Sequence, residues 1–360
     1  MGHMGVYVFF CILSGLIIDR LNPHKLLLIS SAAQFFIVLV FFVTVWFGCK
    51  NQLCVSPILI LIILMAFTGV ATAFFWPVIM GWISTGYEGV ELSKRFGFYN
   101  ITWGIASIIL PIIAGYLVEV NYTLPVFAAV ITSSLCFAAA VSGKYSGKAV
   151  ITQRNQPDQI NGDGVEYRKN AFVWMARIAL LATSTCAGVF RGQVGILYKF
   201  ELGFAESIYG WSVAIMCFFN IVAFYVMGKS HWWHYKKLPF AVGAAAILLS
   251  MLIILMSKNI AMQFLSAAFG GVCYGFAYTS HQYYSISGGK KRLALMAIHE
   301  IIIGAGISAG ALFGGILSDT FGRYSPYKYA CMFVSVAAIA QIVLWFSLRK
   351  KQLAISSNLS

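Results

Sequence analysis

Two ionisable residues, His299 and Glu300, stand within a long apolar segment, where a charged side chain is costly. A carboxyl group about two turns inside a membrane-spanning helix needs either a cationic partner or a bound proton. Adjacent helix residues point about 100° apart, so His299 and Glu300 cannot act as one ligand pair on one face. Proton coupling through Glu300, with His299 beside it, is one hypothesis. An ion pair between Glu300 and a basic cytoplasmic loop is the alternative.

A second set of polar residues lies in the apolar segment 171–197. Arg177, Ser184 and Arg191 recur at helical spacing, so they fall on one face. Such a face could form a cationic wall that recognises an anionic or carboxylate-bearing solute. Alternatively, each arginine extends along its aliphatic stem to a membrane surface, Arg177 on the cytoplasmic side and Arg191 on the outer side.

An aromatic stripe occurs in the segment 260–282, where Tyr274, Tyr278 and His281 share one helix face. Stripes of this kind belong to a packed core more often than to a binding site, so both interpretations stay open.

The sequence gives little support for enzyme chemistry. No Cys-x-x-Cys pair occurs among the eight cysteines, so a structural metal site is not expected. Gly288-Gly289-Lys290 lacks the spacing of a phosphate-binding loop and its following Ser or Thr. An intramembrane enzyme would have only His281, His299 and Glu300 as candidate groups. We therefore predict no catalytic residues, no metal and no cofactor.

These side chains belong to a chain that needs lipid as its solvent. Of its 360 residues, 60% are hydrophobic and only 10% are charged, and the mean hydropathy is +0.82. Soluble domains carry about 25% charged residues. The net charge of +14 could suggest nucleic acid, but the basic residues form small groups between apolar runs rather than one continuous face. Membrane lipids, and not nucleic acid, are the expected partners.

The apolar runs predict an all-α polytopic membrane protein with about eleven transmembrane helices, because each run approaches the roughly 20 residues that span a bilayer. Lys and Arg gather in alternate loops, which marks that side as cytoplasmic and places the C-terminus there, in a plasma or inner membrane. The expected spans are Met1–Ile18, Leu26–Phe47, Ile58–Ile83, Phe98–Leu117, Leu124–Val141, Ala171–Leu197, Ile208–Met227, Leu238–Met256, Ile260–Gln282, Leu293–Leu317 and Tyr327–Leu348.

The two halves of the chain resemble each other, which predicts two pseudo-symmetric bundles. Residues 106–119 align with residues 306–319, and the span before each aligns at a similar offset of about 200 residues. The span 171–197 has no counterpart in the first half, so we expect a helix ahead of Met1 to be missing. The predicted parts are an N-terminal bundle of five spans at 1–141, a cytoplasmic linker at 142–170, a C-terminal bundle of six spans at 171–348 and a cytoplasmic tail at 349–360.

A charged hairpin separates the first two spans. Its acid, Asp19, can accept hydrogen bonds from backbone N–H groups at a helix N-terminus. Its bases, Arg20 and Lys25, can meet lipid phosphates or a carboxylate. A merely solubilising loop is the alternative.

This hairpin resembles the signature of the major facilitator superfamily, Gly-x-Leu-x-Asp-Arg-x-Gly-Arg followed by two basic positions. The glycine, the acid, the first base and the last cation match, at Gly15, Asp19, Arg20 and Lys25. Asn22 replaces the second glycine and Pro23 replaces an arginine, so one charge is lost. The small residues of segment 306–315 also look like a helix pattern of this superfamily.

The resemblance implies that the chain supplies helices two to twelve of a twelve-helix transporter. It also implies that the hairpin, with Asp19 and Arg20 as a latch, holds the cytoplasmic ends of the two bundles together in an outward-open state. The third span, with Trp76, and the span 260–282 would line a central cavity.

The resulting hypothesis is a secondary active transporter, not an enzyme, that moves a small solute by alternating access. Protons as the coupling ion and an anionic solute are both open options. The alternative is a transporter-like membrane sensor or scaffold that does not transport. Nothing in the sequence fixes the substrate, the direction or the coupling ion.

Overall fold

The computed structural model describes residues 2–48, 55–143, 165–289 and 291–358. Within these ranges the regular structure consists of eleven α-helices and one short 3₁₀ turn, and no strand occurs. Nine of the described helices are long and apolar enough to cross a membrane. The predicted all-α polytopic fold is therefore confirmed.

The chain forms two compact units. Unit 1 comprises residues 1–86, 106–152 and 290–304, and unit 2 comprises residues 87–105, 153–289 and 305–360. Each predicted lobe is one continuous stretch of the chain, whereas two helices are divided between the units. The first of them begins in unit 2 and ends in unit 1, and the second begins in unit 1 and ends in unit 2. These helices are α4 (Gly89–Val120) and α10 (Arg292–Phe321).

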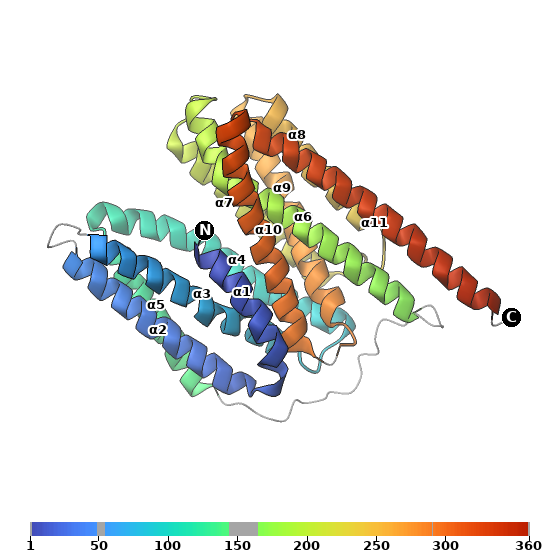
Figure 1. The fold of residues 1–360 in the computed structure, drawn as a ribbon, viewed down its shortest axis with the longest axis horizontal. Coiled ribbons are helices and arrows are strands. Elements are labelled where there is room, and N and C mark those ends of the chain that lie inside the picture. Colours follow the sequence, from blue (N-terminus) through green and yellow to red (C-terminus); the bar gives the residue numbers. More distant parts are fainter. Residues whose placement is uncertain (1, 49–54, 144–164, 290, 359–360) are drawn as a thin grey trace. The chain divides into compact units, whose positions relative to one another are not determined.

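Unit 1 contains four complete α-helices that lie side by side (Figure 1), with α3 against both α1 and α2, and α2 against α5. The 3₁₀ turn η1 joins the first two helices and contains Asp19 and Arg20. The elements of unit 1 are α1 (Gly2–Ile17), η1 (Ile18–Arg20), α2 (Pro23–Gly48), α3 (Val55–Ser84) and α5 (Leu124–Ser142).

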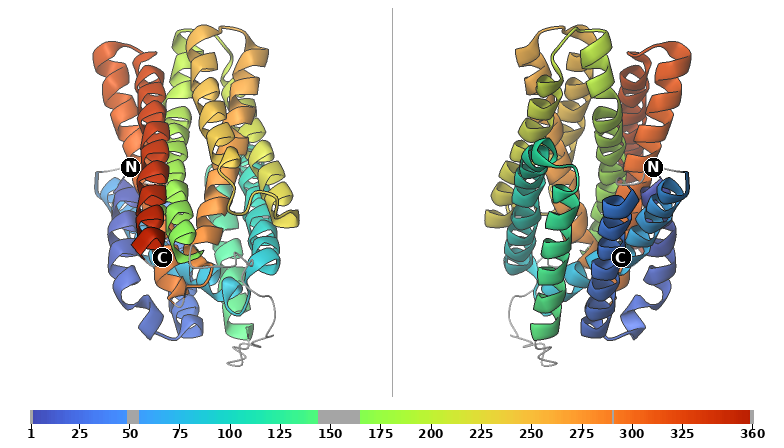
Figure 2. Two further views of the ribbon diagram at one scale, coloured as in Figure 1. Left: turned by 90° about the vertical axis from the view of Figure 1, so that its right-hand side faces the viewer. Right: turned by 90° about the vertical axis from the view of Figure 1, so that its left-hand side faces the viewer.

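Unit 2 contains five complete helices, of which α6, α8, α9 and α11 run alongside one another (Figure 2). Its core includes Phe190 and Val194 of α6, Met251 of α8 and Tyr327 of α11, all nearly inaccessible to solvent. The helices are α6 (Val165–Phe200), α7 (Glu206–Lys229), α8 (Leu238–Met256), α9 (Ile260–Ile286) and α11 (Ser325–Asn358).

Local sequence signals fix several helix ends. The Asn22 side chain accepts hydrogen bonds from the backbone N–H groups of His24 and Lys25, so it caps the start of α2. Asn259 caps α9 in the same way, through the N–H of Ala261. Gly322 follows the last residue of α10 with a φ of 87°, a conformation that glycine adopts without steric cost.

The small residues of α10 are explained by its packing within unit 2. A Cβ atom at Gly306 would lie 2.6 Å from the Cβ of Ser184 on α6, and one at Gly192 would lie 3.5 Å from Ala311. Helices with small facing residues can bring their backbones this close. The glycine pattern therefore serves contact between α6 and the second part of α10.

Several helices extend beyond the predicted apolar spans. α4 begins at Gly89 rather than at Phe98, and α6 begins at Val165, inside the segment expected to be linker. α11 continues to Asn358, through the expected tail. Residues 144–164 of the predicted linker lie outside the described residues. The predicted domain boundaries stay a prediction.

Candidate functional site

A buried hydrogen bond in unit 1 joins Tyr7 of α1 to Glu300 of α10. The Tyr7 hydroxyl donates to Glu300 Oε2 at 2.5 Å. Tyr7 is 5% exposed and Glu300 is 7% exposed, so water has almost no access to either group. The sequence indicated Glu300 but not Tyr7, whose partner is 293 residues away along the chain.

The surroundings of this pair are apolar. Tyr7 packs with the buried residues Cys11 and Ala73, and Trp76 and Ile301 cover this cluster as partly buried neighbours. Trp76, a predicted pathway residue, therefore lies in the cluster that contains Tyr7. A Cβ atom at Gly304 would lie 2.6 Å from a methyl carbon of Val8, so α10 also approaches α1 closely one turn after Glu300.

Glu300 lies deep in a helix that can cross a membrane. Because an α-helix rises about 1.5 Å per residue, Glu300 is about 12 Å along the axis from Arg292, the first residue of α10. Within the described part of the chain, no ion pair forms with Glu300, so the alternative of a salt bridge to a basic loop gains no support. His299 is fully buried one position earlier, on a different face of the helix.

The charged hairpin lies against the start of α10 in unit 1. Asp19 Oδ1 accepts a hydrogen bond from the backbone N–H of Ala294 at 3.4 Å, in the first turn of α10. A Cβ atom at Gly15 would lie 3.3 Å from the Cβ of Ala297. A carboxylate at this position interacts favourably with the positive end of the α10 helix dipole.

The other residues near this contact divide into bonded and exposed groups. The guanidinium of Arg292 donates to the carbonyl oxygen of Ser84 at the end of α3. Arg20 and Lys25 are exposed. Asp19 and Gly15 therefore lie against α10. A role of the hairpin in gating stays a prediction.

The structure does not bring the two arginines of α6 together. Arg191 follows Arg177 by fourteen positions, which corresponds to about 21 Å along the helix. The Arg177 guanidinium lies over the Trp174 ring, 4.6 Å from its centroid, whereas Arg191 is exposed. Ser184 is fully buried between them, next to Gly306. One small anion cannot contact both arginines.

The aromatic stripe of α9 is buried within unit 2. Tyr278 packs between Trp103 of α4 and Phe224 of α7, with ring centroids 5.5 and 5.7 Å away. Tyr274 lies 5.9 Å from Tyr278, and His281 is within hydrogen-bond distance of the Ser285 hydroxyl. This packing is that of a core face.

A polar network missed by the sequence interpretation lies beside this stripe. Asn100 of α4 donates through Nδ2 to Gln282 Oε1 of α9 at 2.7 Å, and Trp103 Nε1 donates to Asn100 Oδ1 at 3.3 Å. Asn100 and Gln282 are both fully buried. A signal was present in the sequence, since each amide interrupts an apolar helix, but nothing in the sequence paired them.

Comparisons with known proteins agree with this architecture. Residues 1–287 match the family model described as Major Facilitator Superfamily. The chain belongs to this superfamily. Among solved structures, it is similar to one titled "Crystal structure of a Major Facilitator Superfamily (MFS) transporter, FucP, in the outward conformation". The TM-score is 0.66 at 12% identity, covering 95% of this chain and 88% of that one. No curated protein sequence matches the chain.

This member of the superfamily is a multi-pass membrane protein. Its family indicates transport rather than catalysis. Within the part of the chain that the structure describes, no group of three or more His, Cys, Asp or Glu side chains could hold a metal ion. The Tyr7–Glu300 pair, the charged hairpin and the α9 stripe are three candidate features for a transport mechanism.

Proposed function

We propose that this transporter is a secondary active transporter that moves a small solute across a cell membrane by alternating access, driven by proton binding and release at Glu300. Its C-terminus would lie in the cytoplasm, on the side where most Lys and Arg of the loops gather.

The observation that carries the proposal is the buried hydrogen bond between Tyr7 and Glu300. A carboxyl group in apolar surroundings favours its neutral form, whereas a hydrogen bond from a hydroxyl stabilises the carboxylate. The two effects oppose each other, which suits a group that must both bind and release a proton. Because no ion pair of Glu300 occurs among the described residues, proton exchange is the simplest way to change its charge.

The charged hairpin supports a gating role in the same proposal. Asp19 would stabilise one state through its hydrogen bond to the start of α10, and Gly15 would allow the close approach to Ala297. Arg20 and Lys25 are exposed and would contact lipid phosphates or the partner surface of the gate. His299, fully buried beside Glu300, is the second candidate for proton coupling.

The solute pathway is proposed to involve Trp76, Ser184, Tyr274, Tyr278 and His281. For an anionic solute, the separation of Arg177 from Arg191 means that each arginine would act at a different stage of transport. Tyr274 and Tyr278 are buried in this structure, so a solute with a planar or apolar part would stack on their rings in another state of the transport cycle.

The test is transport by purified protein in liposomes with an imposed pH gradient. Solutes would first be selected from a library by thermal stabilisation of the protein, because a ligand that binds the folded state raises its melting temperature. Wild-type protein should accumulate the selected solute only when the gradient is present. Glu300→Gln should keep solute exchange without a gradient but lose gradient-driven accumulation.

The matched control is Glu201→Gln, since Glu201 is partly exposed and paired with Arg323 at the end of α6. This variant should accumulate solute as the wild type does. Gradient-driven accumulation by Glu300→Gln would refute proton coupling through this residue. Solute binding without any transport by the wild type would favour the sensor or scaffold alternative.

A further inference from the structure

A groove of about 670 Å³ opens along unit 2 between α8 and α11. Small side chains of both helices create the space, at Ala241, Ala244 and Ala245 of α8 and Ala338 of α11. Most of the groove wall is apolar, and Met175 of α6 closes its inner side. All residues that line the groove belong to unit 2.

The length of the groove equals one leaflet of a bilayer. Its lining on α8 runs from Lys237 to Leu248, about 16 Å along the helix axis, and on α11 from Val334 to Phe346, about 18 Å. The hydrocarbon core of a bilayer is about 30 Å thick, so one leaflet contributes about 15 Å. The groove is therefore long enough to extend from one membrane surface to the bilayer centre.

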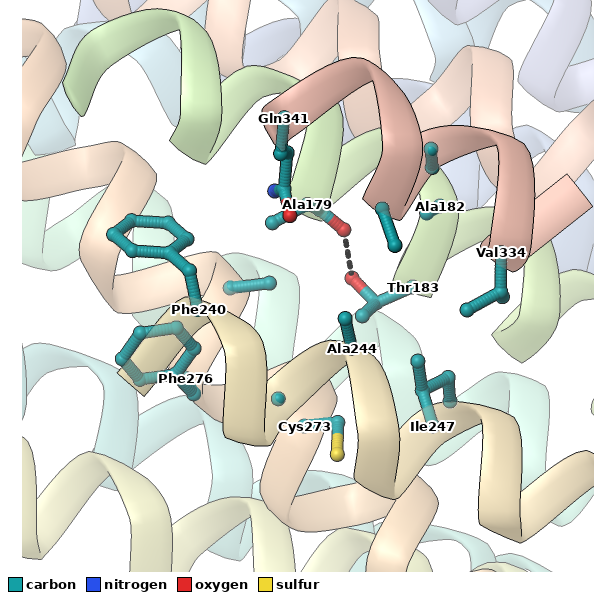
Figure 3. A pocket seen from close by; sticks show the side chains of 14 residues that line it. Ala179, Ala182, Thr183, Phe240, Ala244, Ile247, Cys273, Phe276, Val334 and Gln341 are labelled. Atoms are coloured by element: carbon teal, nitrogen blue, oxygen red, sulfur yellow. Dashed lines mark hydrogen bonds between the residues drawn. The ribbon is translucent and has the colours of Figure 1, made fainter. Parts of the chain in front are cut away.

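The two polar side chains inside the groove, Ser335 and Gln341, already donate hydrogen bonds to backbone carbonyl oxygens. An adjoining pocket among α6, α8, α9 and α11 shares Phe240 and Ala244 with the groove and is lined by Ile247, Cys273 and Val334 (Figure 3). The hydroxyl of Thr183 donates to Ala179 O at 2.9 Å (Figure 3). Gln341 Nε2 donates to Met175 O at 2.8 Å. An occupant of the interior must be hydrocarbon rather than a polar solute.

The mouth of the groove is cationic. The Lys237 ammonium lies 3.9 Å from the centroid of the Trp345 ring, so the two side chains meet across the opening. Among the described residues, no acceptor bonds to Lys237 and the buried Trp345 Nε1 has no hydrogen-bond partner. Both residues lie at the same end of apolar spans, since α8 begins at Leu238 and the span of α11 ends at Phe346. Lysine and tryptophan are suited to the level of lipid headgroups.

We propose that this groove binds an anionic phospholipid from the leaflet that faces the basic loops. One acyl chain lies between α8 and α11 along the alanine residues. The headgroup phosphate accepts a hydrogen bond from Lys237 Nζ, which lies beside the Trp345 ring at the mouth. In the sequence, the basic run Arg349-Lys350-Lys351 follows Trp345 within six residues.

The test is native mass spectrometry of the full-length protein in detergent, with phosphatidylglycerol and phosphatidylcholine added at equal concentration. Wild-type protein should retain phosphatidylglycerol in preference. Lys237→Gln should lower the affinity for phosphatidylglycerol about tenfold, the effect expected for a lost hydrogen bond to a charged group. Lys236→Gln is the matched control, because Lys236 is exposed, adjacent and absent from the groove wall, and it should retain the wild-type preference.

A second pair of variants tests the chain-binding part. Ala245→Trp fills the groove and should reduce retention of both lipids, whereas Val242→Trp, on an exposed position outside the groove wall, should not. Size-exclusion profiles verify that each variant is folded. Equal retention of the two lipids by the wild type, or equal losses for Lys236→Gln and Lys237→Gln, would overturn the proposal. A dimer that Ala245→Trp dissociates, without lipid preference in the wild type, would instead identify the groove as an interface between two copies.

Discussion

Gly97 of α4 and Gly228 of α7 face each other within unit 2, so closely that a Cβ atom at Gly97 would lie 2.6 Å from the Gly228 Cα. That separation is far below van der Waals contact, and the obstructing atom belongs to the backbone. Only glycine at both positions allows this crossing without a shift of one helix.

Gly97→Ala should therefore destabilise the folded protein by about 1–3 kcal/mol, the cost of overpacking a close helix contact. Thermal unfolding in detergent measures this as a lower apparent melting temperature. Gly210→Ala is the control, because nothing lies within 4 Å of a Cβ at Gly210 of α7. Alanine there should be neutral or slightly stabilising. Equal melting temperatures for the two variants would contradict the close crossing.

Tyr7→Phe should shift the pH dependence of transport. The variant removes the donor that stabilises the Glu300 carboxylate, so deprotonation becomes less favourable and the midpoint of the pH profile moves to higher pH. The expected shift is about one to two pH units, since a hydrogen bond to a charged group contributes about 1.5–3 kcal/mol. Initial rates of uptake across a pH series measure it. Tyr329→Phe, at an exposed position of α11, should leave the midpoint unchanged.

Asp19→Asn should loosen the contact between the hairpin and the start of α10. A carboxylate at a helix N-terminus contributes about 0.3–1 kcal/mol, so the population of the open state should rise about two- to fivefold. Maleimide labelling of Ser84→Cys in a background without other cysteines reports the change, because Ser84 is fully buried and its carbonyl bonds to Arg292. Asp319→Asn, exposed near the other end of α10, should not alter the labelling rate. An unchanged rate for Asp19→Asn would remove the support for a latch.

Asn100 and Gln282 should be energetically coupled. Replacing Asn100 by Leu leaves the buried Gln282 Oε1 without its 2.7 Å donor and should cost about 1–3 kcal/mol. The Gln282→Leu variant and the double variant complete a thermodynamic cycle measured by thermal unfolding. We expect a coupling energy of about 1 kcal/mol, so that the double variant loses less than the sum of the single ones. Additive losses would show that the hydrogen bond contributes nothing.

The fold class could be predicted from the sequence because it depends on long apolar runs, and these are local. Helix starts were harder to place. α4 begins at Gly89, nine residues before the predicted start at Phe98. The prediction missed these first turns because they contain the charged residues Glu91, Lys94 and Arg95. Those residues form a helix outside the apolar run, where hydropathy no longer reports it.

The site could be predicted only in part. Glu300 was found because a carboxylate in an apolar run is conspicuous, whereas Tyr7 resembles many other aromatic residues in spans until α10 is placed beside it. The same is true of Asn100 and Gln282. Pairings between residues far apart in sequence depend on tertiary packing, which no local pattern contains.

The hydrogen bond between Tyr7 and Glu300 has one further property. A phenol hydroxyl can both donate and accept, and a protonated carboxyl gains a donor of its own. When Glu300 takes up a proton, the tyrosine can turn its hydrogen away and accept instead, so the two side chains remain joined. Protonation would then alter the electric field around α1 and α10 while leaving their mechanical link intact.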